Sequence, residues 1–309
     1  MTSNALLEVL RKQFDEAVVP VLRAQSVGRK LMPVNPKLSG QGLGVLTVET
    51  LQYVARAGAA TNYDIQNDNF DTIDIKSFPT RIPVQQDDVT IKYRDWKAYE
   101  LKKIPLENDL STDMTSNIIA EQDTLVVDGW KPNGSTYEIK GMYQVAGNTV
   151  SASDSGTYGN LKAATVSGIS LLKADGVYSA GYNLSLASFN FAELMDSEND
   201  TGKEEAPAIL KILNAAAPNE SQPGQIIEAP DLTAGTGMIS PIASQDNLRF
   251  FDIIETQTPE NNLWYADGNV KTGDIKMQQV GALVPRFKHL DKSTMKDVCI
   301  CSVTGLGDS

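Results

Sequence analysis

The 309 residues of this chain suffice for one elaborate domain or two modest ones with a sizeable core. Hydrophobic residues make up 41% and charged residues 21%, as in ordinary globular proteins, and no apolar run approaches the roughly 20 residues that span a bilayer. Because 39 acidic residues outnumber 27 basic ones, the net charge of −12 argues against a nucleic-acid-binding surface, which needs clustered cations.

The N-terminal residues predict a helix followed by a connector. Residues 3–19 carry an apolar stripe at a spacing of four, typical of an amphipathic helix. The stripe is formed by Leu6, Leu10, Phe14 and Val18. Residues 21–29 favour a second short helix, and the proline and glycine residues of segment 31–44 indicate a loop. No secretory signal is visible, so we expect the protein to be made and assembled in a cytoplasm.

Residues 45–99 predict β-structure. Ile73 and Ile75 alternate with polar residues, and so do Val89, Ile91 and Tyr93, which is the period of a half-exposed strand. Asn- and Asp-rich residues separate these pieces, so we expect a long, two-stranded excursion with polar tips. An isolated hairpin is marginal in water. It therefore needs a partner surface, supplied either by another subunit or by a covering element of its own chain.

The next segment, residues 109–129, is the best helix candidate of the chain. It combines a broad apolar stripe with a capping residue at its start and Gly129 at its end. Residues 131–134 (KPNG) predict a turn. Residues 145–159 are rich in Gly, Ser, Thr and Asn, which favours a surface loop or hairpin.

From residue 160 onward, helices and strands alternate without a strict repeat. The predicted helices are 161–173, 189–195 behind a Ser188 cap, and 206–215. The predicted strands are 182–186, 226–230, 237–240, 252–255, 276–284 and 297–303. This order indicates an α+β protein with mixed sheets.

Catalytic and metal-binding patterns are weak. The sequence has no GxSxG, P-loop, HExxH or CxxC motif. Cys299 and Cys301 favour two small buried side chains in a terminal strand over a zinc site with His289, which would lack a fourth ligand. The acidic loop 62–71 lacks the spacing of a calcium-binding EF-hand, and a pair of distant catalytic carboxylates has no positive indication. We predict no cofactor, metal or catalytic residue.

Several segments resemble encapsulins and the major capsid proteins of tailed viruses, which share the Hong Kong 97-type fold. They follow the family order along nearly the whole chain. They are AQSVGRKL at 24–31, DWKAYE at 95–100, AEQDTLVVDG at 120–129 followed by IKGM at 139–142, the helix–turn–strand unit 161–186, and IIEAP at 226–230.

The resemblance implies a division of the chain. Residues 1–46 would form an N-terminal helix and arm, 47–100 an extended β-hairpin loop, 101–142 with 285–309 a peripheral domain with a long spine helix, and 143–284 an axial domain with a mixed sheet. The extended loop would rest on another subunit. Its candidate contact residues are Ile73, Ile75, Phe78, Val89, Ile91, Tyr93 and Trp96. Some relatives crosslink a loop lysine, but nothing singles out Lys76 or Lys92, so we predict no crosslink.

The implied function is that of a structural shell subunit. It would assemble from many copies, as pentamers and hexamers, into an icosahedral capsid enclosing double-stranded DNA without sequence-specific contacts. Portal, scaffold or decoration proteins are further possible partners, and no membrane is expected. The length of the chain and its expected axial loops 146–158 and 256–268 favour a virion over a cytoplasmic encapsulin compartment holding a cargo enzyme. A third alternative, of another class, is a soluble enzyme with unrecognised carboxylate chemistry.

Overall fold

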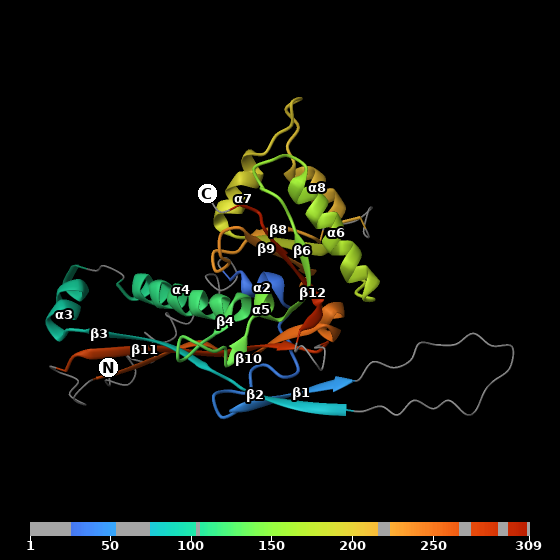
Figure 1. Cartoon of the computed structure of the whole chain (residues 1–309). Coiled ribbons are helices and arrows are strands. Elements are labelled where there is room, and N and C mark those ends of the chain that lie inside the picture. Colours follow the sequence, from blue (N-terminus) through green and yellow to red (C-terminus); the bar gives the residue numbers. More distant parts are fainter. Residues whose placement is uncertain are drawn as a thin grey trace.

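The computed structural model describes residues 26–53, 75–102, 106–215, 223–265, 273–289 and 296–307. The predicted helix 3–19, the acidic loop 62–71 and Ile73 lie outside these residues. The described chain forms an upper body around a five-stranded sheet, a lower layer in which a long helix lies over a three-stranded sheet, and a two-stranded hairpin beneath (Figure 1). No described helix has both the length and the apolar composition needed to cross a membrane.

The lower layer is built from α4 (Leu106–Val127) and an antiparallel sheet of β10 (Phe251–Tyr265), β11 (Ile275–Phe287) and β3 (Val84–Ile91), in that order. The helix α3 (Tyr93–Lys102) leads from β3 back toward α4. The final turns of α4, with Leu125, Val126 and Val127, belong to the main hydrophobic core. The predicted long helix is therefore confirmed, and it begins three residues earlier than expected.

The first half of α4 meets the sheet through polar side chains. Gln279 donates to the Thr115 hydroxyl over 2.9 Å, and Asn261 approaches Ser111 at 3.4 Å. A small separate apolar cluster of Met114 and Met277 lies among them. Hydroxyl groups bury less apolar area than methyl groups would, so Ser111 and Thr115 contribute less hydrophobic burial than Leu125, Val126 and Val127 do.

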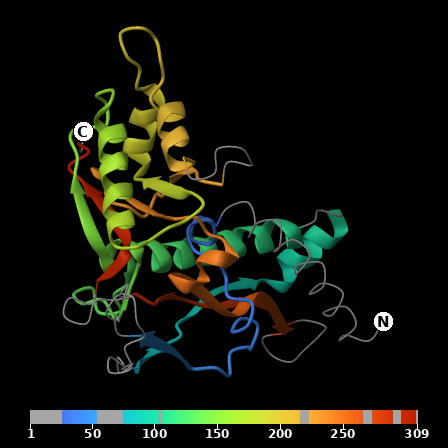
Figure 2. The same ribbon diagram turned by 90° about the vertical axis from the view of Figure 1, so that its right-hand side faces the viewer.

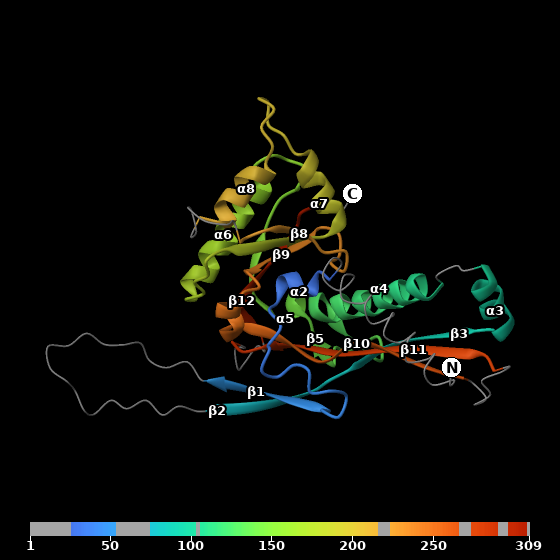
Figure 3. The same ribbon diagram turned by 180° about the vertical axis from the view of Figure 1, so that it is seen from behind.

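The upper body surrounds a mixed sheet with helices on two sides. The strand order is β6 (Ala146–Ser151), β12 (Asp297–Thr304), β9 (Thr236–Pro241), β7 (Tyr182–Leu186) and β8 (Ile226–Glu228). The helices α6 (Asn160–Ala174) and α8 (Ala206–Leu213) lie on one flank, and α7 (Ser188–Asp196) lies on the other (Figures 1 and 3). All five residues of β7 are buried without alternation, because both faces of the sheet are covered.

The hairpin consists of β1 (Thr47–Tyr53) and β2 (Ile75–Arg81), paired antiparallel from Thr47–Arg81 to Tyr53–Ile75. The remaining elements are short and connect these layers. They are α2 (Gly28–Leu31), β4 (Gly129–Trp130), β5 (Ile139–Lys140), α5 (Met142–Val145) and the 3-10 turn η1 (Gln245–Arg249).

Long-range strand pairing corrects several sequence-based expectations. The strand with Val89 and Ile91 does not extend the hairpin but pairs with β11, and Tyr93 begins α3 instead of continuing that strand. The expected loop 145–159 contains β6, an edge strand whose polar residues face solvent. Most of the expected loop 256–268 belongs to β10, which runs on to residue 265. Ser188 is the first residue of α7, not its cap.

The sheets also group the chain differently from the division implied by the resemblance. The C-terminal strand β12, expected beside the long helix, lies in the upper sheet between β6 and β9. The strands β10 and β11, expected in the axial part, lie under α4. Such pairings join segments about 150 residues apart, as for Cys301 and Asn148, and local sequence patterns do not encode them.

Candidate assembly surfaces

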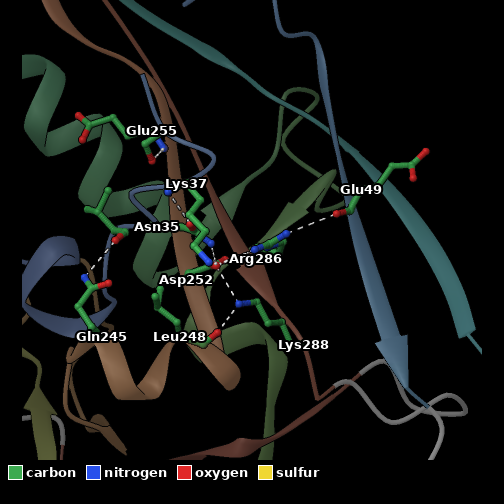
Figure 4. Close-up of polar contacts among 11 residues, drawn as sticks. Asn35, Lys37, Glu49, Gln245, Leu248, Asp252, Glu255, Arg286 and Lys288 are labelled. Carbon is green, nitrogen blue, oxygen red and sulfur yellow. Dashed lines mark hydrogen bonds and ion pairs between the residues drawn. The ribbon is translucent and has the colours of Figure 1, made fainter. Parts of the chain in front are cut away.

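A buried ionic cluster, which we name the hairpin root, joins the hairpin to the body (Figure 4). Asp252 of β10 is completely buried. The Arg286 guanidinium of β11 donates two hydrogen bonds to the Asp252 carboxylate, from Nε to Oδ1 at 2.8 Å and from Nη2 to Oδ2 at 2.6 Å. Lys288 Nζ donates to the same Oδ2 over 2.8 Å and also to the Leu248 carbonyl. Asn35 of the N-terminal connector donates to Oδ2 over 2.6 Å.

The charge state of Asp252 follows from these bonds. Burial alone would raise the pKa of this carboxyl, because a charge is poorly solvated in the protein interior. The hydrogen bonds from Arg286, Lys288 and Asn35 outweigh burial and hold the pKa of Asp252 below its usual range. Asp252 is therefore ionised at neutral pH, and two cations from one strand end converge on it.

The same guanidinium reaches the hairpin. Arg286 Nη1 lies 3.4 Å from the carbonyl oxygen of Glu49 in β1, and the Ile82 amide donates to the Leu46 carbonyl over 3.0 Å. Beside these bonds lies a hollow of about 280 Å³ between the hairpin, β5 and β11. It is lined in part by Thr50, Pro79, Tyr137, Ile139, Val145 and Phe287. The direction of the hairpin thus depends on few contacts around a cavity.

A second polar anchor holds the start of the described chain on α4. Asp123 accepts bonds from the amides of Val27 and Gly28, each over 2.8 Å, and from the Ser26 hydroxyl over 3.0 Å. A Cβ on Gly28 would lie 2.9 Å from Asp123 Oδ1 and 3.1 Å from Val126 Cβ, so a larger residue would force these side chains to shift. Arg29 then bridges Gln122 over 2.9 Å and Glu255 over 2.5 Å. The segment SVGRK at 26–30 therefore attaches the N-terminal connector to α4. Burial raises the pKa of Asp123 despite the hydrogen bonds that it accepts.

A surface groove of about 530 Å³ runs between β3 and α4. Its walls include Val84, 53% exposed, and Trp130, 41% exposed, next to the carboxylates of Asp87 and Glu121. Exposed large apolar side chains that share one groove are typical of a contact surface.

Comparison with known proteins finds solved structures with a similar architecture. No family model and no curated protein matches the chain. The virus-like particle protein from Pyrococcus furiosus matches at a TM-score of 0.60 and 14% identity, covering 94% of this chain and 98% of that one. The capsid of Myoviridae phage XM1 matches at 0.60 and 15%, covering 89% and 90%. The structure from Mycobacterium phage Bobi matches at 0.59 and 11%, covering 92% and 91%.

The chain has the Hong Kong 97-type capsid fold. The predicted fold class, α+β with a long helix and a mixed sheet, is thereby confirmed. At these identities the likeness is one of fold. It spans nearly the whole of each chain.

The described residues that were predicted to contact another subunit lie on three different elements. Ile75 and Phe78 lie in β2, opposite Tyr53 and Thr50. Val89, Ile91, Tyr93 and Trp96 instead lie at the lower sheet and α3. Ile91 is 8% exposed, and Val89 and Trp96 pack against the Met114–Met277 cluster of their own chain. Their place in an interface remains a prediction.

Sequence reasoning missed the hairpin root. Asp252 and Arg286 are 34 residues apart and meet only because β10 pairs with β11. The sequence does place Arg286, Lys288 and His289 close together next to an expected strand. Partly buried cations next to a strand end could have pointed to a buried acidic partner.

The two cysteines and the histidine show structural roles. Cys299 and Cys301 are fully buried in β12, which confirms them as small core side chains. Burial raises the pKa of both thiols, that of Cys301 to about 11. His289 packs against the Phe250 ring at 5.7 Å. Within the described ranges, no group of three or more His, Cys, Asp and Glu side chains is placed to hold a metal ion.

Proposed function

We propose that this chain is the major capsid protein of a tailed virus, and that many copies assemble into an icosahedral shell around double-stranded DNA. Support comes from the capsid fold, which phage structures share over nine-tenths of the chain. The net charge of −12 suits a shell wall that encloses DNA without binding its phosphates tightly. Assembly would take place in the host cytoplasm.

The hairpin is the observation that carries this proposal. Among the described strands, none besides β1 and β2 pairs with either of the two, and the hairpin runs beneath and away from the lower sheet (Figure 1). A two-stranded ribbon is marginal alone. Its root is nevertheless fixed by the fully buried Asp252 and the Arg286 fork. A fixed root and a ribbon that pairs with no third described strand suit an arm that a neighbouring subunit covers.

We propose the groove between β3 and α4 as part of the surface that receives this arm. Val84 and Trp130 offer exposed apolar area there. Ile75 and Phe78 of the arm are the candidate contacts. The lower layer and hairpin would form the peripheral part of the shell. The upper body would form the axial part, whose tips meet in pentamers and hexamers. Portal, scaffold and decoration proteins remain further proposed partners.

An encapsulin compartment is the second candidate. The Pyrococcus furiosus virus-like particle matches as well as the phage capsids do, and 98% of that chain is covered. Moreover, parts of segments 146–158 and 256–268, expected as viral expansions, form the strands β6 and β10 of the two larger sheets. This removes part of the argument from length for a virus.

The test is to express the whole chain and examine it by light scattering, electron microscopy and nuclease-protection assays. The shell proposal predicts closed particles or capsomer-sized precursors of them. A stable monomer or small oligomer at all tested concentrations would contradict it and favour the enzyme alternative. Particles isolated from the native source separate the two shells: protected double-stranded DNA supports the virion, and an enclosed protein without DNA supports the encapsulin.

A further inference from the structure

The upper body exposes an uncharged strip along the outer side of α6, which we name the α6 stripe. Its residues recur at helical spacing and all are exposed. They are Ala163, Val166, Ser167, Ser170 and Leu171. Val166 is 46% exposed and Leu171 is 38% exposed. The Ser170 hydroxyl donates to the Val166 carbonyl of its own helix over 2.8 Å, so its donor is already satisfied when the stripe is covered. Figure 2 turns this flank toward the viewer.

The helix α7 carries a second such strip, the α7 stripe. It consists of Ser188, Phe189, Ala192 and Met195. Phe189 is 37% exposed and Met195 is 50% exposed. The α6 stripe presents mainly small and branched side chains, whereas the α7 stripe presents two large ones. Because α6 and α7 lie on opposite flanks of the upper body, one copy cannot bring the two stripes together (Figures 1 and 3).

The charges beside the stripes have opposite signs. Lys162 and Lys173 are exposed at the two ends of the α6 stripe, and neither lies among the buried residues of α6. Asp196 is exposed at the end of the α7 stripe. On the same flank, Asp154 and Glu193 converge on Gly156, within 3.5 and 3.6 Å of the Cβ that it would carry. Asp175, the exposed residue that follows α6, adds one carboxylate next to Lys173, so the α6 flank carries two lysines and one acid beside its stripe, and the α7 flank carries the three carboxylates named here.

We propose that the α6 stripe of one copy packs against the α7 stripe of the next copy, head to tail, and that this contact builds the ring of upper bodies. A contact between two different patches on opposite sides of a subunit is heterologous, and it closes into a ring when the rotation allows. Large side chains against small ones, with lysines facing carboxylates, fit such a contact. This inference rests on the proposed shell function, because it identifies which faces join the copies.

The test uses one blocked variant for each face in the full chain. V166E places a charge in the α6 stripe, and M195E places one in the α7 stripe. Both sites are exposed, so circular dichroism and thermal unfolding should match the unchanged chain. Tyr178, 64% exposed in the same body but on neither helix, gives the matched control Y178E. We expect the unchanged chain and Y178E to form multi-copy particles, and each blocked variant to form neither rings nor closed particles by light scattering and electron microscopy.

Mixing the two blocked variants distinguishes a contact between two different stripes from a contact between two identical stripes. Each retains one intact stripe, so the equimolar mixture should form stripe-to-stripe pairs of one V166E and one M195E chain but no ring of upper bodies. Ring or particle assembly of V166E or M195E alone to the same extent as the unchanged chain would overturn the inference. So would failure of Y178E alongside them. If the unchanged chain itself stays monomeric, the shell proposal fails instead.

Crosslinking gives a second readout that does not depend on blocking. The native cysteines are buried, so introduced thiols react selectively. In assembled particles of the double variant S167C/A192C, a short bifunctional thiol reagent should give a ladder extending beyond dimers. S167C and A192C alone should remain single chains. Intact particles of the double variant without a ladder would overturn the proposed contact.

Discussion

Removal of the Asp252 charge tests whether the hairpin root is a structural anchor. Asp252→Asn keeps the size of the side chain but leaves the cations of Arg286 and Lys288, whose side chains are 12% and 21% exposed, without their anion. Breaking a buried ion pair from one side destabilises a protein by about 3–5 kcal/mol, and the partial exposure of both cations favours the lower end, about 3 kcal/mol. At about 2 °C per kcal/mol for a chain of this size, we expect thermal unfolding roughly 6 °C lower.

The assay is calorimetry with circular dichroism at several pH values and salt concentrations. The folded-state pKa of Asp252 is lowered, so its contribution is fully present above the unfolded value of about 3.9 and declines as the pH falls through the folded value. The difference between the two proteins should be constant from pH 7 to about 5 and shrink below about 4. It should persist in high salt, because buried pairs are screened weakly.

Two further measurements sharpen this prediction. Lys92 pairs with Asp274 at the surface with 69% of its side chain exposed, so Lys92→Gln should leave the unfolding temperature unchanged. In Asp252→Asn, the released Arg286 should loosen its contact with Glu49 and accelerate amide exchange in β1 and β2 near the root. Unfolding within 1 °C (about 0.5 kcal/mol) of the unchanged protein, or a difference that high salt abolishes, would refute the reasoning.

Three further experiments test the glycine that follows α4, the Asp123 anchor and the burial of the two cysteines. Gly129 has a φ of 108°, and a Cβ there would lie 2.5 Å from the Ile139 carbonyl oxygen, so Gly129→Ala should destabilise the protein by at least about 3 kcal/mol in denaturant titrations. Gly134 has a φ of 73° but lies in open space, so Gly134→Ala should cost only about 1–2 kcal/mol. Equal losses for the two substitutions would contradict the steric argument. Asp123→Ala should cost about 2–3 kcal/mol, because it leaves the Val27 and Gly28 amides without an acceptor, and amide exchange at α2 reports the loss. Cys299 and Cys301 should not react with a thiol reagent at pH 8 until the protein is unfolded, and fast labelling of the native state would show that β12 is not buried.

Elements defined by local patterns were predictable from the sequence. The long helix, the KPNG turn and the strand Tyr182–Leu186 follow from periodicity, caps and turn residues. The buried state of Cys299 and Cys301 followed from their spacing in an apolar strand. These features depend on interactions within a few residues, which the sequence displays directly.

Sheet membership and the hairpin root were not predictable in this way. β6 contains Gly147, Asn148 and Thr149, a composition that suggests a loop, yet it pairs in parallel with β12 at the edge of the upper sheet. An edge strand tolerates weak strand formers because the neighbouring strand supplies its hydrogen bonds. The Asp252–Arg286 pair likewise exists only after β10 and β11 have paired, so no spacing rule reveals it.

The surfaces proposed for assembly share a different property: they leave apolar side chains or strand edges without a partner in the described part of one copy. Val166 and Met195 leave apolar area in solvent on opposite flanks, and the ribbon of β1 and β2 has no third strand among the described residues. A chain selected only to fold alone would gain from polar residues at Val166 and Met195. Their exposure is an argument for a second copy that does not depend on the likeness to known shells, and the two blocked variants test it separately.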